Sequence, residues 1–580
     1  MKKYLVVFIS TFLSLPSIFF SQPKKTAADL FEHANKNYEC KDYQGAITDY
    51  SDAIRIQPDY AEAYYGRGLT KFKLNDFQGS AADNAEAIKL KPDYGIAYYG
   101  RAYAEFKLND TQKSLADYTE AIRLKQGFTE AYYGRGYAKF KLKDNQGAID
   151  DYTEAIKLKP DYAEAYYGRG NAKSELNDNQ GAIADYTEAI QIKPDYAEAC
   201  YSKGLARFKL HDYQGSAADF MDAIKLKPEY AEAFYNRGYA KFKLNDYQGS
   251  LADYTEAIRL KADYAEAFYG RGYAKFALND FQGAIADYTE AVKVKPDFTE
   301  GYYGRGLAKF KLNDNQGSIV DYTETLKLKP DYTEACYNRA YAKFRLNDNQ
   351  GAIADYTLAM KLKPDYAEAY YGRGYAKFKL KDNQGALADF TEAMKLKPDY
   401  AEVYCGRGYV KSELKDNLGS LADFKEAIKL KPDYADAYYG RGYAKSESND
   451  NQGSLADFKE AIKLKPDYAN AYYGRGLAKF KLNDLQGSLS DYTEAIKLQS
   501  NYASAYYGRG YAKFKLKDNQ GSVVDYTAAI KLKPDYANAY YGRGLAYLSL
   551  DLKTEAKADF MKANELGLRI PQKILDMCNE

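Results

Sequence analysis

The sequence predicts an all-α fold in which one helix–turn–helix unit is repeated along the chain. Within each stretch of about 34 residues, the apolar side chains twice follow the three-and-four spacing of an amphipathic helix. A fixed period of this kind indicates a linear array, because each unit can bury its apolar face only against its neighbours. The period is marked by prolines separated by 34 residues or a multiple of it: Pro58, Pro92, Pro160, Pro194, Pro228, Pro296, Pro330, Pro364, Pro398, Pro432, Pro466 and Pro534.

Residues 367–400 illustrate one unit, and its boundaries carry recognisable signals. Asp382 stands between the two helical stretches, where its carboxylate can cap the second helix by accepting a free backbone N–H. Pro398 is expected to end the second helix, because proline lacks an N–H and clashes with the preceding turn. Asp399 followed by Glu402 predicts a capping box at the start of the next unit.

The unit resembles the tetratricopeptide repeat (TPR), a helix pair of the same length. That family keeps small residues at positions eight, twenty and twenty-seven of the unit, and here these are Gly374, Ala386 and Ala393. The resemblance implies a right-handed α-solenoid of about sixteen units, covering residues 27–570. Two positions depart from the family: Arg373 replaces a leucine at position seven, and Lys377 replaces a tyrosine at position eleven. We expect their stems to lie along apolar surface while their charges reach water.

The N-terminus has the pattern of an export signal. Lys2 and Lys3 precede an apolar stretch, residues 4–20, which is followed by Ser21. We predict a signal peptide at residues 1–21 and an exported protein that is periplasmic, cell-surface or secreted. If the signal is cleaved, no stable membrane insertion is expected. The alternative is a membrane anchor formed by residues 4–20.

At the other end of the array, residues 571–580 are expected to form a short C-terminal tail. Ile574 and Leu575 in this tail are expected to cover the last apolar face, because a terminal unit has no further neighbour to bury it.

Composition and spacing argue against several classes of function. Basic and acidic side chains balance, 83 against 81, so no global field favours nucleic acid. The recurring acidic side chains are expected to be helix caps or solvated charges. The five cysteines lie too many units apart to pair, and neither they nor the two histidines, His33 and His211, have the spacing of a metal site. We therefore predict no enzyme, no cofactor and no metal site.

The resemblance implies that the first helix of each unit lines a concave face that binds extended peptides or partner helices. Position five of the unit is expected to face it, and this position is tyrosine in most units, interrupted by Cys405. Tyrosine offers a broad apolar face and a hydroxyl at low entropic cost. The candidate ligand-binding residues are Tyr65, Tyr99, Tyr133, Tyr167, Tyr201, Tyr235, Tyr269, Tyr303, Tyr337, Tyr371, Tyr439, Tyr473, Tyr507 and Tyr541.

Several alternatives stay open at this stage. The rings could simply pack against a neighbouring unit, the ligand could be a glycan or cell-wall polysaccharide, or the array could be a structural spacer. Glycine at position six, such as Gly372, costs roughly 1 kcal/mol in a helix, which indicates close approach either of a ligand or of the next unit. Three units replace the usual Phe–Lys pair at positions twelve and thirteen, which predicts acidic and less apolar patches at residues 174–175, 412–413 and 446–447.

Overall fold

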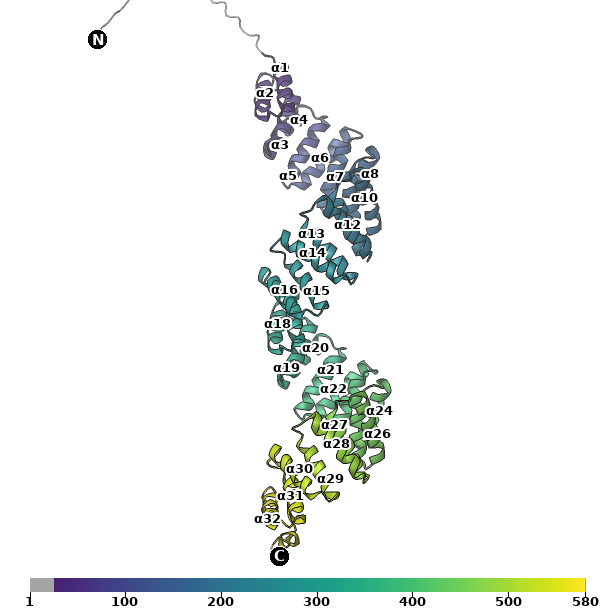
Figure 1. Ribbon diagram of the computed structural model, residues 1–580. Helices are drawn as coiled ribbons and strands as arrows, with labels where there is room; N and C mark the ends of the chain where they lie inside the picture. The colour runs from purple at the N-terminus through teal and green to yellow at the C-terminus, as the bar shows by residue number, and fades with distance from the viewer. Residues whose placement is uncertain (1–24, 579–580) are drawn as a thin grey trace, which may run out of the picture. The chain divides into compact units, whose positions relative to one another are not determined.

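The computed structural model describes residues 25–578, and these residues are helical without a strand (Figure 1). The predicted signal peptide, residues 1–21, lies outside the described residues. Contacts divide the chain into an N-terminal half, up to Val294, and a C-terminal half, from Lys295. Consecutive helices pack as pairs within each half, so the prediction of an all-α array of sixteen helix pairs is confirmed.

The helices of the N-terminal half are α1 (Ala27–Glu39), α2 (Tyr43–Ile56), α3 (Ala61–Lys73), α4 (Phe77–Leu90), α5 (Gly95–Lys107), α6 (Thr111–Leu124), α7 (Thr129–Lys141), α8 (Asn145–Leu158), α9 (Ala163–Glu175), α10 (Asn179–Ile192), α11 (Ala197–Lys209), α12 (Tyr213–Leu226), α13 (Ala231–Lys243), α14 (Tyr247–Leu260), α15 (Ala265–Ala277) and α16 (Phe281–Val294). Odd numbers are first helices of a unit, and even numbers are second helices.

The helices of the C-terminal half are α17 (Thr299–Lys311), α18 (Asn315–Leu328), α19 (Thr333–Arg345), α20 (Asn349–Leu362), α21 (Ala367–Lys379), α22 (Asn383–Leu396), α23 (Ala401–Glu413), α24 (Asn417–Leu430), α25 (Ala435–Glu447), α26 (Asn451–Leu464), α27 (Ala469–Lys481), α28 (Leu485–Leu498), α29 (Ala503–Lys515), α30 (Asn519–Leu532), α31 (Ala537–Ser549), α32 (Lys553–Glu565) and the short α33 (Gln572–Asp576). Ile574 and Leu575 pack on the last buried cluster, beside Phe560, as predicted for the end of the array.

The turn inside each unit forms as its sequence predicts. Lys381 adopts a left-handed conformation with φ of 65°, which reverses the chain after α21. Asp382 then accepts a hydrogen bond of 2.9 Å from the backbone N–H of Gly385 and caps α22. The predicted capping role of Asp382 is therefore confirmed.

The junction between units forms differently from the prediction. The residue at the N-cap of α23 is Tyr400, which makes no side-chain cap. Its ring packs on Tyr371 with centroids 5.2 Å apart, and Glu402 accepts from Lys431 Nζ at 2.9 Å instead of folding back. The capping box expected at Asp399 and Glu402 is wrong, because aromatic packing fixes the cap position and directs the acidic groups elsewhere.

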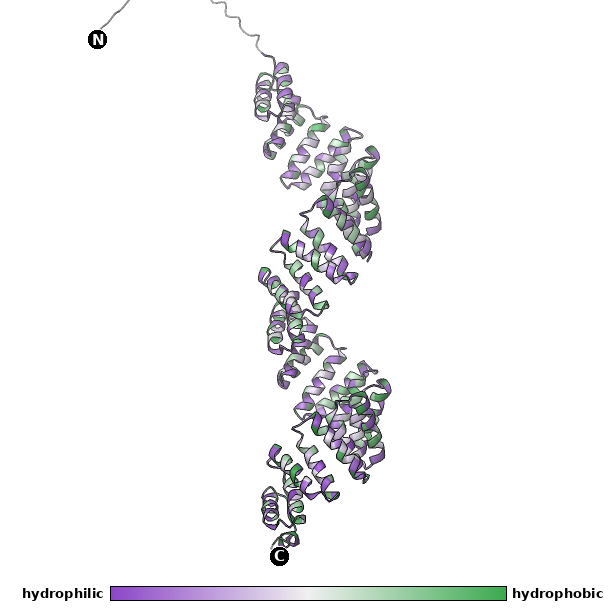
Figure 2. Cartoon of the chain, viewed as in Figure 1, coloured by the Kyte–Doolittle hydropathy of each residue, from purple (hydrophilic) through white to green (hydrophobic). Residues whose placement is uncertain are grey.

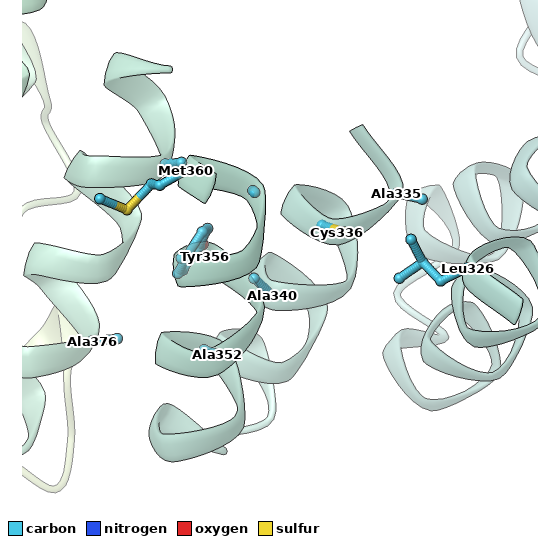
Figure 3. Packing of buried hydrophobic residues seen from close by; sticks show 10 residues of the cluster. Leu326, Ala335, Cys336, Ala340, Ala352, Tyr356, Met360 and Ala376 are labelled. Carbon is cyan, nitrogen blue, oxygen red and sulfur yellow. The ribbon is translucent and has the colours of Figure 1, made fainter. Parts of the chain in front are cut away.

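In every unit but the second, which has Asn84, a buried ring at position twenty-four holds the unit against its neighbour. Tyr152 on α8 is 1% exposed and lies between Gly136 of its own unit and Gly168 of the following unit. A Cβ built on these glycines would come within 3.1 Å of Tyr152 Cδ1 and 2.6 Å of Tyr152 Cζ, respectively. Close contact between units therefore accounts for the glycine at position six, without a ligand. Figure 3 shows the corresponding cluster of small residues around Tyr356.

Each helix from α1 to α32 has a buried stripe and a solvated face, and polar and apolar residues alternate along it (Figure 2). All five cysteines are free, four of them buried, which agrees with the prediction of unpaired thiols. Between residues 25 and 578, no helix is both long enough and apolar enough to cross a membrane.

Candidate functional site

Arginine at position seven and lysine at position eleven bind one buried aspartate of their own unit. Arg373 Nε and Nη2 donate to the two carboxylate oxygens of Asp389 at 2.9 and 2.6 Å, and Lys377 Nζ lies 2.8 Å from Asp389 Oδ2. Asp389 is 3% exposed, and a carboxylate at that depth is costly unless it is paired. The expectation that the charges of Arg373 and Lys377 reach water is wrong, and so is the expectation that the recurring acids only cap helices or face solvent.

We call this arrangement the ion triad, and it joins the two helices of a unit. It recurs with both cations around Asp83, Asp151, Asp185, Asp253, Asp287, Asp321, Asp355, Asp423, Asp457, Asp491 and Asp525. In the first unit His33 takes the place of the arginine, with its Nδ1 2.6 Å from Asp49. These charges hold the fold together and are already paired.

The fourteen candidate tyrosines at position five lie at equivalent places on the first helices, and all are half-buried. Tyr133 shows the environment: its ring contacts Tyr152 at 5.7 Å and Tyr162 at 5.0 Å between centroids, both within the same unit. Burial raises the pKa of Tyr133 to about 12. Each ring therefore packs into its own unit and leaves only part of its surface on the face of the first helices.

The more exposed rings on this face are tyrosines at position nine, which the list of candidates omitted. Tyr103 and Tyr273 are 38% and 46% exposed. Tyr103 stacks on Phe72, the position-twelve residue of the preceding unit, with centroids 4.6 Å apart, and Lys107 Nζ lies 5.6 Å from its centroid. Position nine alternates among tyrosine, leucine and asparagine, so it lacks the regularity that marks position five.

Cavities open on this face between first helices of neighbouring units. One of about 180 Å³ lies between α3 and α5 and is lined by Tyr65 and Tyr99. Another of about 200 Å³ lies between α19 and α21 and is lined by Tyr337 and Tyr371. Four of the candidate tyrosines thus line a hollow wide enough for a small side chain.

Two larger cavities, each of about 450 Å³, occur where serine replaces the phenylalanine of position twelve. One is lined by Ser174 and Glu175, and the other by Ser412, Glu413 and Glu447. Loss of the ring leaves space in both places. The predicted acidic patch is present at residues 412–413, where Glu413 and Glu447 line the cavity. At residues 174–175 and 446–447 a lysine of the following unit, Lys209 or Lys481, lies against the serine and offsets the charge of the glutamate.

Nothing in the described part of the chain groups three or more histidine, cysteine or acidic side chains in the way a metal ion requires. His33 lies beside Asp49, to which Asn37 also donates. His211 lies in a turn at φ of 62°, where its Nδ1 is 2.8 Å from the Tyr213 hydroxyl. The face of the first helices, with its rings and cavities, is thus the candidate site.

The stacked helix pairs and their ring-lined face define a helical-repeat interaction scaffold. Family models described as TPR repeat and tetratricopeptide repeat match most of the chain, and the chain belongs to the tetratricopeptide-repeat family. The TPR repeat model matches residues 34–75, 136–177, 170–211, 238–278, 272–313, 343–381, 412–447, 442–483, 476–517 and 510–551. Tetratricopeptide repeat models match residues 68–127, 197–230, 367–400 and 537–566.

Solved structures similar to this chain include other repeat proteins. The APC/C hetero-tetramer Cut9–Hcn1 is 15% identical, with 84% of this chain and 96% of that chain covered and a TM-score of 0.39. Yeast Tom70 is 17% identical, with 74% and 97% covered and a TM-score of 0.34. A tetratricopeptide repeat protein from Parabacteroides merdae is 19% identical, with 43% and 99% covered and a TM-score of 0.34. The comparison with curated proteins found no match.

Membership of this family establishes the general role. TPR arrays are scaffolds that bind protein or peptide partners, and they are generally non-catalytic.

Proposed function

We propose that the protein is an exported, non-catalytic scaffold that binds extended peptide or partner segments along the face of its first helices. The observation that carries this proposal is the recurrence of cavities between successive first helices, where edges of the position-five tyrosines meet the exposed rings of position nine. The repetition matches the chemistry of an extended chain, which presents side chains at regular intervals.

The binding arises from many weak contacts. A ring edge supplies apolar area and a hydroxyl, which suits adaptable recognition of peptide groups. Because the units are covalently joined, engagement of one unit raises the effective concentration of the next contact. A partner segment that spans several units therefore binds more tightly than any single cavity allows.

The test is partner capture in the native cell. In-cell crosslinking followed by mass spectrometry identifies what the wild-type chain binds. The variant Tyr103→Ser/Tyr137→Ser/Tyr273→Ser removes three exposed rings, and we expect it to lose most of the captured partner. Val320→Ser/Val524→Ser is the matched control, because these residues are 53% and 66% exposed but lie on second helices.

Two outcomes contradict this function. Retention on polysaccharide that depends on the same tyrosines indicates a glycan-binding module. Indifference to the tyrosine changes, combined with sensitivity to deletion of whole units, indicates a structural spacer.

Export is tested separately, by fractionation and by sequencing the N-terminus of the mature chain. We expect a chain outside the cytoplasm that begins after Ser21. A cytoplasmic chain that retains residues 1–21 contradicts export, and a membrane-bound chain that retains them supports the anchor formed by residues 4–20.

A further inference from the structure

Three units carry serine at position twelve, and they differ in the side chain that the following unit places beside the serine. At Ser174, Lys209 Nζ of the following unit donates to Oγ at 3.2 Å. At Ser446, Lys481 Nζ of the following unit donates to the backbone oxygen at 3.2 Å and to Oγ at 3.3 Å. In both places a lysine ammonium from position thirteen of the next unit occupies the serine site.

Ser412 is the exception. Position thirteen of its following unit is Glu447, so the site receives a carboxylate in place of an ammonium. Glu447 makes no ion pair anywhere in residues 25–578, while Glu413 beside it is paired with the exposed Lys381 at 3.2 Å. Lys415 also lines the cavity. The site therefore keeps the serine that accepts from an ammonium in its two counterparts, but has no lysine at the equivalent position.

A second substitution lies in the same unit as Ser412. Cys405 replaces the tyrosine of position five and is buried. In its neighbourhood the Tyr409 ring turns inward, donates from its hydroxyl to the backbone oxygen of Asp436 at 2.8 Å, and packs edge-on against Phe424 at 5.1 Å. The position-nine ring of the preceding unit, Tyr375, packs edge-on in the same way against Phe390 at 5.8 Å, whereas Tyr103 stacks outward on Phe72. Tyr409 and Ser412 both line the hollow of about 450 Å³ between α23 and α25.

The walls of the cavity have the chemistry of a cation site. Tyr443 is 49% exposed and lines the cavity with Tyr409 and Tyr439. In regular units the position-nine ring carries an internal lysine on its face: Lys141 Nζ is 5.4 Å from the Tyr137 centroid. In the units of Tyr409 and Tyr443 that lysine is replaced by Glu413 and Glu447. Aromatic faces beside carboxylates attract ammonium groups.

We propose that this cavity, bounded by Ser412, Glu413, Tyr443 and Glu447, binds the side-chain ammonium of a lysine presented by the protein partner. The proposal rests on the scaffold function above and adds a fixed position to it: the partner segment is registered on the array by a lysine between α23 and α25. Lysine is the occupant because Lys209 and Lys481 show a lysine ammonium at both equivalent sites.

The experiment uses the full chain and a synthetic probe, a capped glycine–serine peptide with one central lysine flanked by a photoreactive diazirine. The matched probe carries acetyl-lysine, which removes the charge. Mass spectrometry maps the crosslinks, and we expect about tenfold more crosslinking at α23 and α25 with lysine than with acetyl-lysine. In the variant Glu413→Gln/Glu447→Gln, crosslinking of the lysine probe at α23 and α25 should fall to the level seen with the acetyl-lysine probe.

Two further variants define the result. Glu447→Lys should abolish crosslinking there, because an internal ammonium then reaches Ser412 as Lys481 reaches Ser446. Glu175→Gln changes the cavity where Lys209 is already present, and it should leave crosslinking at α23 and α25 unchanged. Circular dichroism checks that each variant is folded, and all three changes are at exposed side chains.

Equal crosslinking by both probes, or no effect of the double glutamine variant, overturns the proposal. Competition by tetramethylammonium at a concentration where lysine amide does not compete also overturns it, in favour of a small quaternary cation. If the lysine and acetyl-lysine probes crosslink equally but the full chain still captures its partner in the cell, the lysine site is overturned and the scaffold function stands. Failure of the tyrosine experiment overturns the scaffold function, whatever the peptide does.

Discussion

Glu105 on α5 stands at position eleven, where most other units carry lysine or arginine. Its neighbour Asp117 is already bound by Arg101 Nε at 2.6 Å, so the unit holds two carboxylates and one cation. Burial, followed by the charge of Asp117, raises the pKa of Glu105 to about 7, and Glu105 Oε2 is buried without a hydrogen-bond partner. The third unit therefore has a weakened ion triad.

The raised pKa of Glu105 predicts a pH dependence. Its native pKa of about 7 lies above the unfolded value near 4.5, so the native state binds more protons between these values and the free energy of unfolding falls as pH rises through this window. Glu105→Lys should restore the triad and raise the stability of α5 and α6, more at pH 8 than at pH 5. Native-state hydrogen exchange of α5 and α6 at pH 5 and pH 8 measures this gain in stability.

The converse change is the control for Glu105. Lys139 in the next unit pairs with Asp151 at 2.8 Å, and Lys139→Glu should create a similar pH dependence in α7 and α8. Identical stability of wild type and Glu105→Lys at both pH values would contradict the assignment.

At the scale of the element, helix boundaries were predictable wherever one side chain acts on its own backbone. Asp382 is followed three residues later by Gly385, whose N–H it caps, and that relation is visible in the sequence. Asp399 looked equivalent but does not cap α23, because Tyr400 occupies the cap and packs on Tyr371. A ring contact between residues almost thirty positions apart cannot be read from local spacing.

The two aspartates give a matched pair of predictions. Asp382→Ala removes a side-chain cap and should destabilise α22 by about 1 kcal/mol. Asp399→Ala removes no cap and should change the stability of α23 by only a few tenths of that amount. Native-state hydrogen exchange of the first turns of α22 and α23 measures both stability changes. Equal destabilisation by the two substitutions would contradict the prediction and would indicate that Asp399 caps α23.

The candidate site was less predictable than the fold. Position five is conspicuous because it repeats, yet its rings are half-buried, whereas the exposed rings of position nine vary along the chain. The ion triad joins residues sixteen positions apart on two helices, as Arg373 joins Asp389. Sequence periodicity identifies a helix face, but the pairing of charges across two faces depends on how the helices pack.

At the scale of the whole molecule, each unit depends on its immediate neighbours alone. Rings such as Tyr152 contact the unit before the junction and the unit after it. In such an array stability is approximately a sum of units and the interfaces between adjacent units. A unit can therefore be removed if the remaining ends stay in phase.

Deletion of residues 231–264 joins Tyr230 directly to Ala265 and preserves the order of positions in the unit. We expect the shortened chain to keep the helical signal per residue in far-ultraviolet circular dichroism and a cooperative melt. Deletion of residues 231–247 is the control, because it removes the first helix α13 and makes the second helices α12 and α14 consecutive. Equal behaviour of the two deletions would contradict nearest-neighbour packing.

The contact of Lys481 with Ser446 shows how a chain of nearly identical repeats can acquire a binding site at one particular position. The side chain beside each serine comes from the following repeat. The charge of a serine site is therefore determined by two adjacent repeats together and not by either one alone. Gain or loss of copies inside a uniform stretch alters length and leaves recognition unchanged. If recombination replaced the repeat after Ser412 with one that carries lysine at position thirteen, that lysine would bind Ser412. The site would then be closed to a partner's lysine, although the repeat that contains Ser412 had not changed.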